Sequence, residues 1–146
     1  MHRFQFRLGS VLGWRAVELE LEEGRLEQLF TELRHRDAEA LALQVRGRES
    51  AQLIAAKTLD GQQLAALSYH RHYLEREAAR LAAQRADCSK RIAAQQQRVV
   101  EAERKVRLLE RLKQRRLAEW TFEFNREMEA LASETFLAKW AREKGR

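Results

Sequence analysis

The 146-residue chain contains no proline, only one cysteine and only six glycines. Without proline, the chain lacks the residue that most often ends or kinks a helix. A single cysteine excludes an internal disulfide framework and is typical of a reducing cytosol. No stretch approaches the ~18 consecutive apolar residues of a membrane span. Charges also interrupt the first eight residues too often for a signal-peptide core.

Strong helix formers dominate what is present: Ala, Leu, Glu, Arg, Gln and Lys. Charged residues make up 34% of the chain and aromatics 8%, a mixture typical of long helices or coiled coils. The net charge is +6 and the sequence pI is about 10.0. This basic balance permits a nucleic-acid or acidic-membrane partner but requires neither.

A seven-residue repeat of apolar side chains runs through the first third of the chain. One row is Leu12, Leu19, Leu26, Leu33 and Ala40, and its companion row contains Leu8, Leu29 and Leu43. The spacings alternate between four and three, so both rows lie on one stripe of one helix. The pattern predicts a helix over about residues 8–56.

A break follows, and a second seam begins after it. Asp60 is a good N-cap, and Gln63 three residues later completes a capping-box pattern. The sequence predicts a turn at about 57–61 and a second helix over about 62–142. Its seam consists of Leu64, Leu67, Leu74, Ala78, Leu81, Cys88, Ile92, Val99, Ala102, Val106 and Leu109, interrupted by Arg71, Arg85 and Gln95. Beyond Leu109, two consecutive four-residue steps form a stutter, which locally unwinds a supercoil.

A single short break favours folding back, because neither helix can bury its seam alone. The predicted fold class is therefore all-α, a long two-helix antiparallel coiled-coil hairpin forming a single domain over 1–146. A fold-back near Leu59 places residue i opposite roughly residue 118 − i. The last stretch of helix two, roughly thirty residues, then extends beyond the start of helix one.

Aromatic and charged residues are unevenly distributed along this hairpin. Eight of the eleven aromatics gather at its open end: Phe4, Phe6, Trp14, Trp120, Phe122, Phe124, Phe136 and Trp140. We expect some to pack together and others to form a protein-binding surface. Residues 17–28 hold five glutamates and one arginine, whereas residues 98–116 hold eight basic and three acidic side chains. Partial pairing of these stretches would help to set an antiparallel register.

No catalytic, cofactor-binding or metal-binding pattern is recognisable. Gly9 and Gly13 are followed by no Lys-Ser or Lys-Thr pair. His70 and His72 fall on different helix faces without further ligands. Cys88 occupies a seam position that favours a small buried hydrophobe over a nucleophile. Since a two-helix coil offers no concave pocket to perturb a carboxylate, we expect no enzyme activity and no cofactor.

Three blocks together resemble the flagellar FliJ family. These are Phe4-Gln5-Phe6-Arg7-Leu8 with Val11, Leu12 and Arg15; then Tyr69-His70-Arg71-His72-Tyr73-Leu74; and the basic stretch from Val106 to Arg116, followed by the segment from Trp120 to Trp140. The resemblance spans nearly the whole chain in order, length and spacing.

The resemblance implies a cytoplasmic component of the flagellar type III export apparatus, peripheral to the inner membrane at the flagellar base. Such proteins are similar to the central stalk of rotary ATPases. They bind a hexameric export ATPase, promote its ring assembly, contact the export gate protein FlhA and act as chaperones or chaperone escorts. We assign ATPase binding to Trp14, Arg104, Lys105, Arg107, Arg111, Arg115, Arg116, Trp120 and Phe124. We assign gate binding to Tyr73 and Leu74.

Three alternatives remain open. The first is the equivalent stalk of a virulence-type injectisome, which has the same architecture and other partners. The second is nucleic-acid binding by the basic helix, which is disfavoured because Glu101, Glu103 and Glu110 interleave with its basic residues. The third is a self-associating coiled coil, in which arginines at seam positions oppose a tight symmetric dimer.

Overall fold

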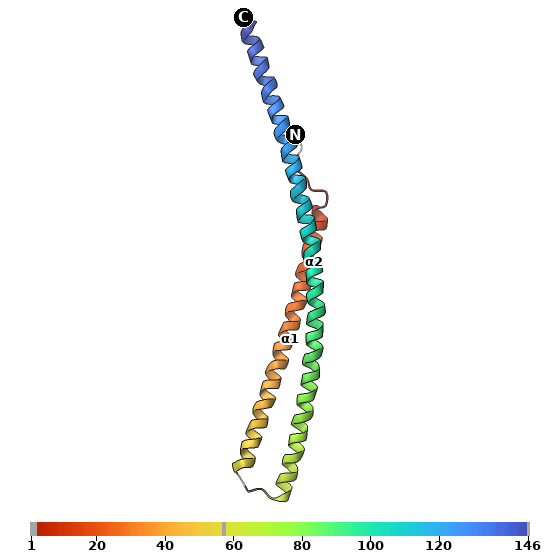
Figure 1. Cartoon of the computed structure of the whole chain (residues 1–146), viewed down its shortest axis with the longest axis vertical. Coiled ribbons are helices and arrows are strands. Elements are labelled where there is room, and N and C mark those ends of the chain that lie inside the picture. The colour runs from red at the N-terminus through yellow and green to blue at the C-terminus, as the bar shows by residue number, and fades with distance from the viewer. Residues whose placement is uncertain (1–2, 57, 146) are drawn as a thin grey trace. The chain divides into compact units, whose positions relative to one another are not determined.

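The computed structural model describes residues 3–56 and 58–145, and within them the chain forms two helices and no strand. Helix α1 spans Gly9–Ala56 and helix α2 spans Gly61–Lys144. The two long helices pack against each other as an antiparallel hairpin, so the predicted fold class is confirmed (Figure 1). Lys57, in the predicted turn, lies outside the described residues.

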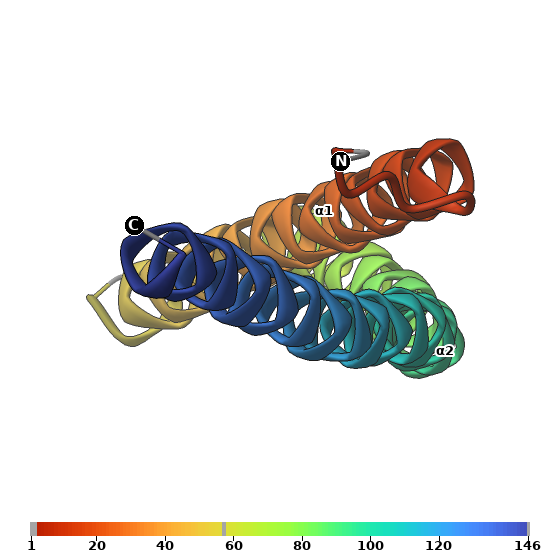
Figure 2. The ribbon, with the colours of Figure 1, turned by 90° about the horizontal axis from the view of Figure 1, so that it is seen from above.

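The chain divides into two compact units. The hairpin unit is Glu20–Glu101, and the terminal unit combines Met1–Leu19 with Ala102–Arg146. In the hairpin unit, α1 and α2 lie side by side from the turn onward (Figures 1 and 2). In the terminal unit, the first residues of α1 lie against a much longer part of α2.

The start of α2 carries the capping box that the sequence predicts. The backbone N–H of Gln63 donates to Asp60 Oδ1 at 2.8 Å. In return, the Asp60 N–H donates to Gln63 Oε1 at 3.2 Å. These reciprocal bonds satisfy donors that would otherwise have no partner at a helix N-terminus. They make Asp60 a definite boundary between the turn and α2.

The core of the hairpin unit is a narrow seam, because two helices can shield each other on one face only. No described residue of α1 is fully buried, although the leucines of its two rows are half-buried; Leu8, which precedes α1, is exposed. The residues of α2 that are buried in this unit are Leu81, Cys88, Ile92 and Gln95. Near the turn, Leu64 and Ala78 are exposed despite their predicted seam positions. The seam residues of α2 are therefore more deeply buried away from the turn than next to it.

The contacts across the seam show the register of the two helices. Cys88 Sγ lies 3.5 Å from the Leu29 carbonyl oxygen, and Gln95 Nε2 donates to the Glu22 carbonyl oxygen at 3.0 Å. The 118 − i relation places residue 30 opposite Cys88 and residue 23 opposite Gln95. The observed partners, Leu29 and Glu22, are each one position away. The buried amide of Gln95 also donates to the Glu22 carboxylate, so this interruption of the apolar seam is a satisfied polar contact.

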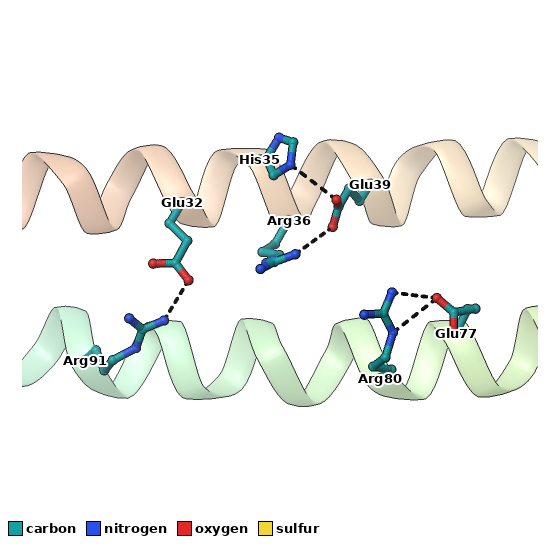
Figure 3. Close-up of polar contacts among 7 residues, drawn as sticks. All are labelled: Glu32, His35, Arg36, Glu39, Glu77, Arg80 and Arg91. Atoms are coloured by element: carbon teal, nitrogen blue, oxygen red, sulfur yellow. Dashed lines mark hydrogen bonds and ion pairs between the residues drawn. The ribbon is translucent and has the colours of Figure 1, made fainter.

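Ion pairs between the helices occur at a different place from the one expected. Among the described residues, Arg91 Nη2 lies 2.8 Å from Glu32 Oε1 (Figure 3), and Arg85 Nε lies 2.6 Å from Asp37 Oδ1. The predicted pairing of stretches 17–28 and 98–116 forms no described ion pair. Some of those side chains instead pair on their own helix, as Glu22 does with Arg25, Glu103 with Arg107 and Arg116 with Glu119, at the separations of three and four residues that helix geometry favours.

Candidate protein-binding surfaces

The end of α2 is the least covered part of the terminal unit. Every described residue from 125 to 145 is exposed, because α1 contributes only Gly9–Leu19 to this unit. Phe136 remains 69% exposed and Trp140 49% exposed. Large aromatic side chains in such positions are typical of surfaces that bind another protein.

The segment preceding α1 contacts one member of an aromatic pair on α2. The rings of Trp120 and Phe124 stack at a centroid distance of 5.1 Å, and the Phe4 ring lies 6.0 Å from Trp120. A cavity of about 590 Å³ lies beside this contact, lined by residues 4–8 and by residues of α2 that include Leu112 and Glu123. Phe4 thus packs on Trp120, one of the residues that we assigned to ATPase binding.

Other aromatics of this unit remain open to solvent. Trp14 is 60% exposed, and the Arg15 guanidinium carbon lies 4.6 Å from the centre of its ring. Phe122, on the face of α2 opposite Trp120, is also exposed. No described aromatic contact joins Trp14 to Trp120 or Phe124. The predicted aromatic group is therefore divided into a packed cluster and separate exposed rings.

The basic stretch of α2 presents several charges without partners. Arg104, Lys105, Arg111 and Arg115 are exposed and form no ion pair with any described residue. By helix periodicity, the three arginines face away from buried Val106. The other two predicted residues are engaged within α2, Arg107 with Glu103 at 3.4 Å and Arg116 with Glu119 at 3.1 Å.

Charges on both helices influence the pKa of one glutamate in this unit. The hydrogen bond from Arg15 is the main reason that the pKa of Glu18 lies below its ordinary value, and the charge of Lys105 on α2 contributes further. This is the only part of the expected pairing between the acidic and basic stretches that the described residues show.

A groove between the helices opens in the hairpin unit, toward the turn. Its volume is about 510 Å³, and Leu67, Leu74 and Leu81 line its α2 wall. The α1 wall consists largely of small residues, Ala40, Gly47, Ser50 and Ala51. In Figure 1 the two ribbons diverge in this region. Small side chains opposite leucines leave space that the two helices do not fill.

The two predicted gate-binding residues lie at different places around this groove. Leu74 is half-buried and lines it. Tyr73 is exposed outside it, with its ring stacked on His70 at a centroid distance of 6.4 Å. The two residues therefore offer an apolar contact in the groove and an aromatic contact beside it.

Charged side chains also pair within each helix of the hairpin unit, as Figure 3 shows. Arg36 and His35 both contact the Glu39 carboxylate, whereas Arg80 contacts Glu77 on its own helix. Arg36 Nε is buried without a hydrogen-bond partner. No group of three or more His, Cys, Asp or Glu side chains within the described residues could hold a metal ion. The Arg36–Glu39 and Arg80–Glu77 contacts are ion pairs between oppositely charged side chains.

Sequence reasoning did not identify two features of these surfaces. Phe4 was grouped with the other aromatics but not recognised as the cover of Trp120. The groove was also not recognised, although Ala40, Gly47 and Ala51 follow spacings of seven and four. That run of small residues on the seam face is the signal that could have indicated it.

Comparisons with protein-family models, with curated proteins and with solved structures found no match to this chain. Neither described helix has a stretch long and apolar enough to cross a membrane.

Proposed function

We propose that this chain is a coiled-coil stalk protein and general chaperone of a flagellar type III export apparatus. In this proposal it binds a hexameric export ATPase, promotes assembly of the ATPase ring and links the ring to the export gate. It acts in the cytoplasm, peripheral to the inner membrane at the flagellar base. It has no catalytic activity of its own.

The observation that carries the proposal is the exposed basic and aromatic surface of α2 in the terminal unit. Arg104, Arg111 and Arg115 form no ion pair with any described residue there, and Phe122 and Trp140 are exposed further along the same helix. Unpaired guanidinium groups and aromatic rings are the side chains that most often dominate protein interfaces. Such a surface suits a stalk that binds inside a protein ring.

The groove near the turn supports a second contact, which we assign to the export gate. Leu74 would contribute apolar area inside the groove and Tyr73 a ring beside it. Because the groove belongs to the hairpin unit and the basic surface to the terminal unit, the two contacts use different residues and can be tested separately.

The test of the ATPase contact combines the purified chain with the export ATPase of the same organism. Hydrolysis rate and ring formation are measured together, and we expect the chain to increase both. Replacing Arg104, Arg111 and Arg115 by Glu should abolish the stimulation. The matched control replaces Arg46, Arg48 and Arg76 by Glu, since these exposed arginines lie in the hairpin unit.

Two outcomes would contradict the ATPase proposal. One is no stimulation by the helical wild-type chain at any ratio, and the other is equal loss in both triple variants. Running the ATPase of a virulence-type injectisome in parallel separates the flagellar assignment from its nearest alternative. Stimulation of the injectisome ATPase alone would replace the flagellar assignment.

The gate contact is tested by the affinity of the chain for the cytoplasmic domain of FlhA. Combining Tyr73→Ala with Leu74→Asp should weaken binding by at least roughly tenfold, because both substitutions remove apolar contact area. Tyr69→Ala is the control, since Tyr69 is 73% exposed and does not line the groove. Unchanged affinity in the double variant would remove the gate assignment.

A further inference from the structure

The apolar seam of α2 continues beyond the part of the helix that α1 covers. After buried Val106, side chains on the same helix face include Leu117, Trp120, Phe124, Met128 and Leu131. Trp120 and Phe124 are half-buried. Leu117, Met128 and Leu131 are 42%, 44% and 51% exposed. We call these five residues the docking strip. Its continuity with the seam between α1 and α2 indicates that a helix should cover it.

The repeat of the strip differs from that of the leucine rows of α1. Val106, Leu117 and Met128 are eleven residues apart, and so are Leu109, Trp120 and Leu131. An eleven-residue repeat corresponds to about 3.67 residues per turn. Helices that pack along such a repeat form a right-handed supercoil. A helix with a seven-residue repeat supercoils in the opposite sense. The strip should therefore favour a helix that also has an eleven-residue repeat.

One edge of the strip is acidic. By helix periodicity, Glu123, Glu127 and Glu134 lie along the same side of it. None of the three forms an ion pair with a described residue. The other edge, with Thr121, Asn125 and Ala132, carries no charge. A helix with lysine or arginine along the facing edge would complement these glutamates.

We propose that the docking strip binds one amphipathic helix of a partner protein, with an eleven-residue apolar repeat and one basic edge. Phe4 is a removable cover of the strip, because its ring packs on Trp120. No described hydrogen bond or ion pair joins residues 3–8 to α2. The incoming helix displaces Phe4 and continues the packing that α1 begins.

A second copy of this chain fits the strip less well than such a partner. Two strips paired antiparallel would bring their acidic edges together. Two strips paired in parallel would place each acidic edge against uncharged residues. Neither arrangement gives the glutamates an opposite charge. The proposal also does not rest on the export function, because its evidence and its test involve no component of an export apparatus.

The test uses a labelled synthetic peptide of about 33 residues, three repeats of eleven, with leucine on the apolar stripe and lysine along one edge. Fluorescence anisotropy measures its affinity for the full chain. A peptide with glutamate in place of lysine and a peptide of the same composition with a seven-residue repeat are the controls. We expect binding of the lysine peptide at least roughly tenfold tighter than that of either control.

Variants of the chain then locate the binding site. Leu131→Glu should weaken binding by at least roughly tenfold. Phe4→Ala should strengthen it by roughly threefold or more, because the cover no longer competes. Leu137→Ala, on a face of α2 that points away from the strip, should leave the affinity unchanged. Circular dichroism confirms that each variant remains helical, as expected for substitutions at exposed sites and in a segment outside the helices.

Three results would overturn the proposal. The first is no binding of the lysine peptide by the wild-type chain and by Phe4→Ala. The second is equal binding of the lysine and glutamate peptides, or binding that Leu131→Glu does not weaken. The third is a chain that sedimentation shows to dimerise through the strip, with Leu131→Glu monomeric, which would make a second copy the occupant.

Discussion

Cys88 occupies the most enclosed position among the described residues. Its side chain has no exposed surface, and its sulfur lies 3.5 Å from the Leu29 carbonyl oxygen. Its place on the seam favours a small hydrophobe with weak hydrogen-bonding capacity. The sequence predicted this structural role from seam spacing alone, and the burial of Cys88 confirms it.

The enclosure of Cys88 leads to a prediction about side-chain size. Cys88→Leu should destabilise the chain by about 1–3 kcal/mol, because additional methylene groups at a filled site force the helices apart. Urea unfolding followed by circular dichroism measures the change. Ala86→Leu, at an exposed position two residues away, should change stability by less than about 0.5 kcal/mol. Equal stability of both variants would show that the site is not closely packed.

Gln95 shows what residue-level sequence reasoning could not provide. In the sequence it appears as a polar interruption of an apolar row. In the structure its amide donates to the Glu22 carbonyl oxygen at 3.0 Å and also to the Glu22 carboxylate. A buried amide is tolerated only when partners meet it. Whether partners exist depends on the register of the other helix, which the spacing on α2 does not reveal.

At the scale of the helices, the ion pair between Glu32 and Arg91 links α1 to α2. The hydrogen bond from Arg91, followed by its positive charge, lowers the pKa of Glu32 below its ordinary value, against the raising effect of desolvation. The same contact raises the pKa of Arg91. The pair therefore favours the ionised form of Glu32 in the folded chain.

This shift predicts how stability depends on pH. Because the pKa of Glu32 is lower in the folded than in the unfolded chain, its contribution is present above the unfolded pKa. The contribution is lost as the pH falls through the folded pKa. Urea unfolding of the wild type and Glu32→Gln, compared between about pH 6 and pH 3, should show a difference in stability that shrinks on acidification. A difference that is constant across this range would contradict the assignment.

The helix boundaries follow local rules that can be recognised in the sequence. The reciprocal bonds of Asp60 and Gln63 mark the start of α2, and the absence of proline lets both helices run uninterrupted. The positions of the ion pairs were less predictable. Expected between residues 17–28 and 98–116, they occur where Glu32 and Asp37 meet Arg91 and Arg85. Which ion pairs long charged side chains form depends on local geometry as much as on the overall charge of a stretch.

At the scale of the whole molecule, burial differs greatly along α2. Leu81, Cys88 and Ile92 are buried in the hairpin unit. In the terminal unit, every described residue from 125 to 145 is exposed. Most of the stability of helices in proteins comes from packing of an apolar face rather than from helix propensity. The end of α2 therefore gains little stability from packing against the rest of the described chain.

We expect amide hydrogen exchange to reveal this difference. Amides of residues 125–144 should exchange fast in the free chain, whereas those of 81–95 should be protected by the stability of the packed seam. Adding the lysine-edge peptide should slow exchange in 117–134 and leave 81–95 unchanged. Strong protection of 125–144 in the free chain would show that the helix end is stable without a partner.

Much of this protein follows from its amino-acid sequence alone. The all-α class, the capping box at Asp60 and the apolar rows, with Cys88 in one of them, depend on near neighbours in the chain. Local propensity and periodicity therefore predict them. The tertiary structure decided which aromatics are covered, where charges pair between the helices and where a groove remains. These features depend on side chains far apart in sequence, whose contacts are set only when the two helices pack at a definite register.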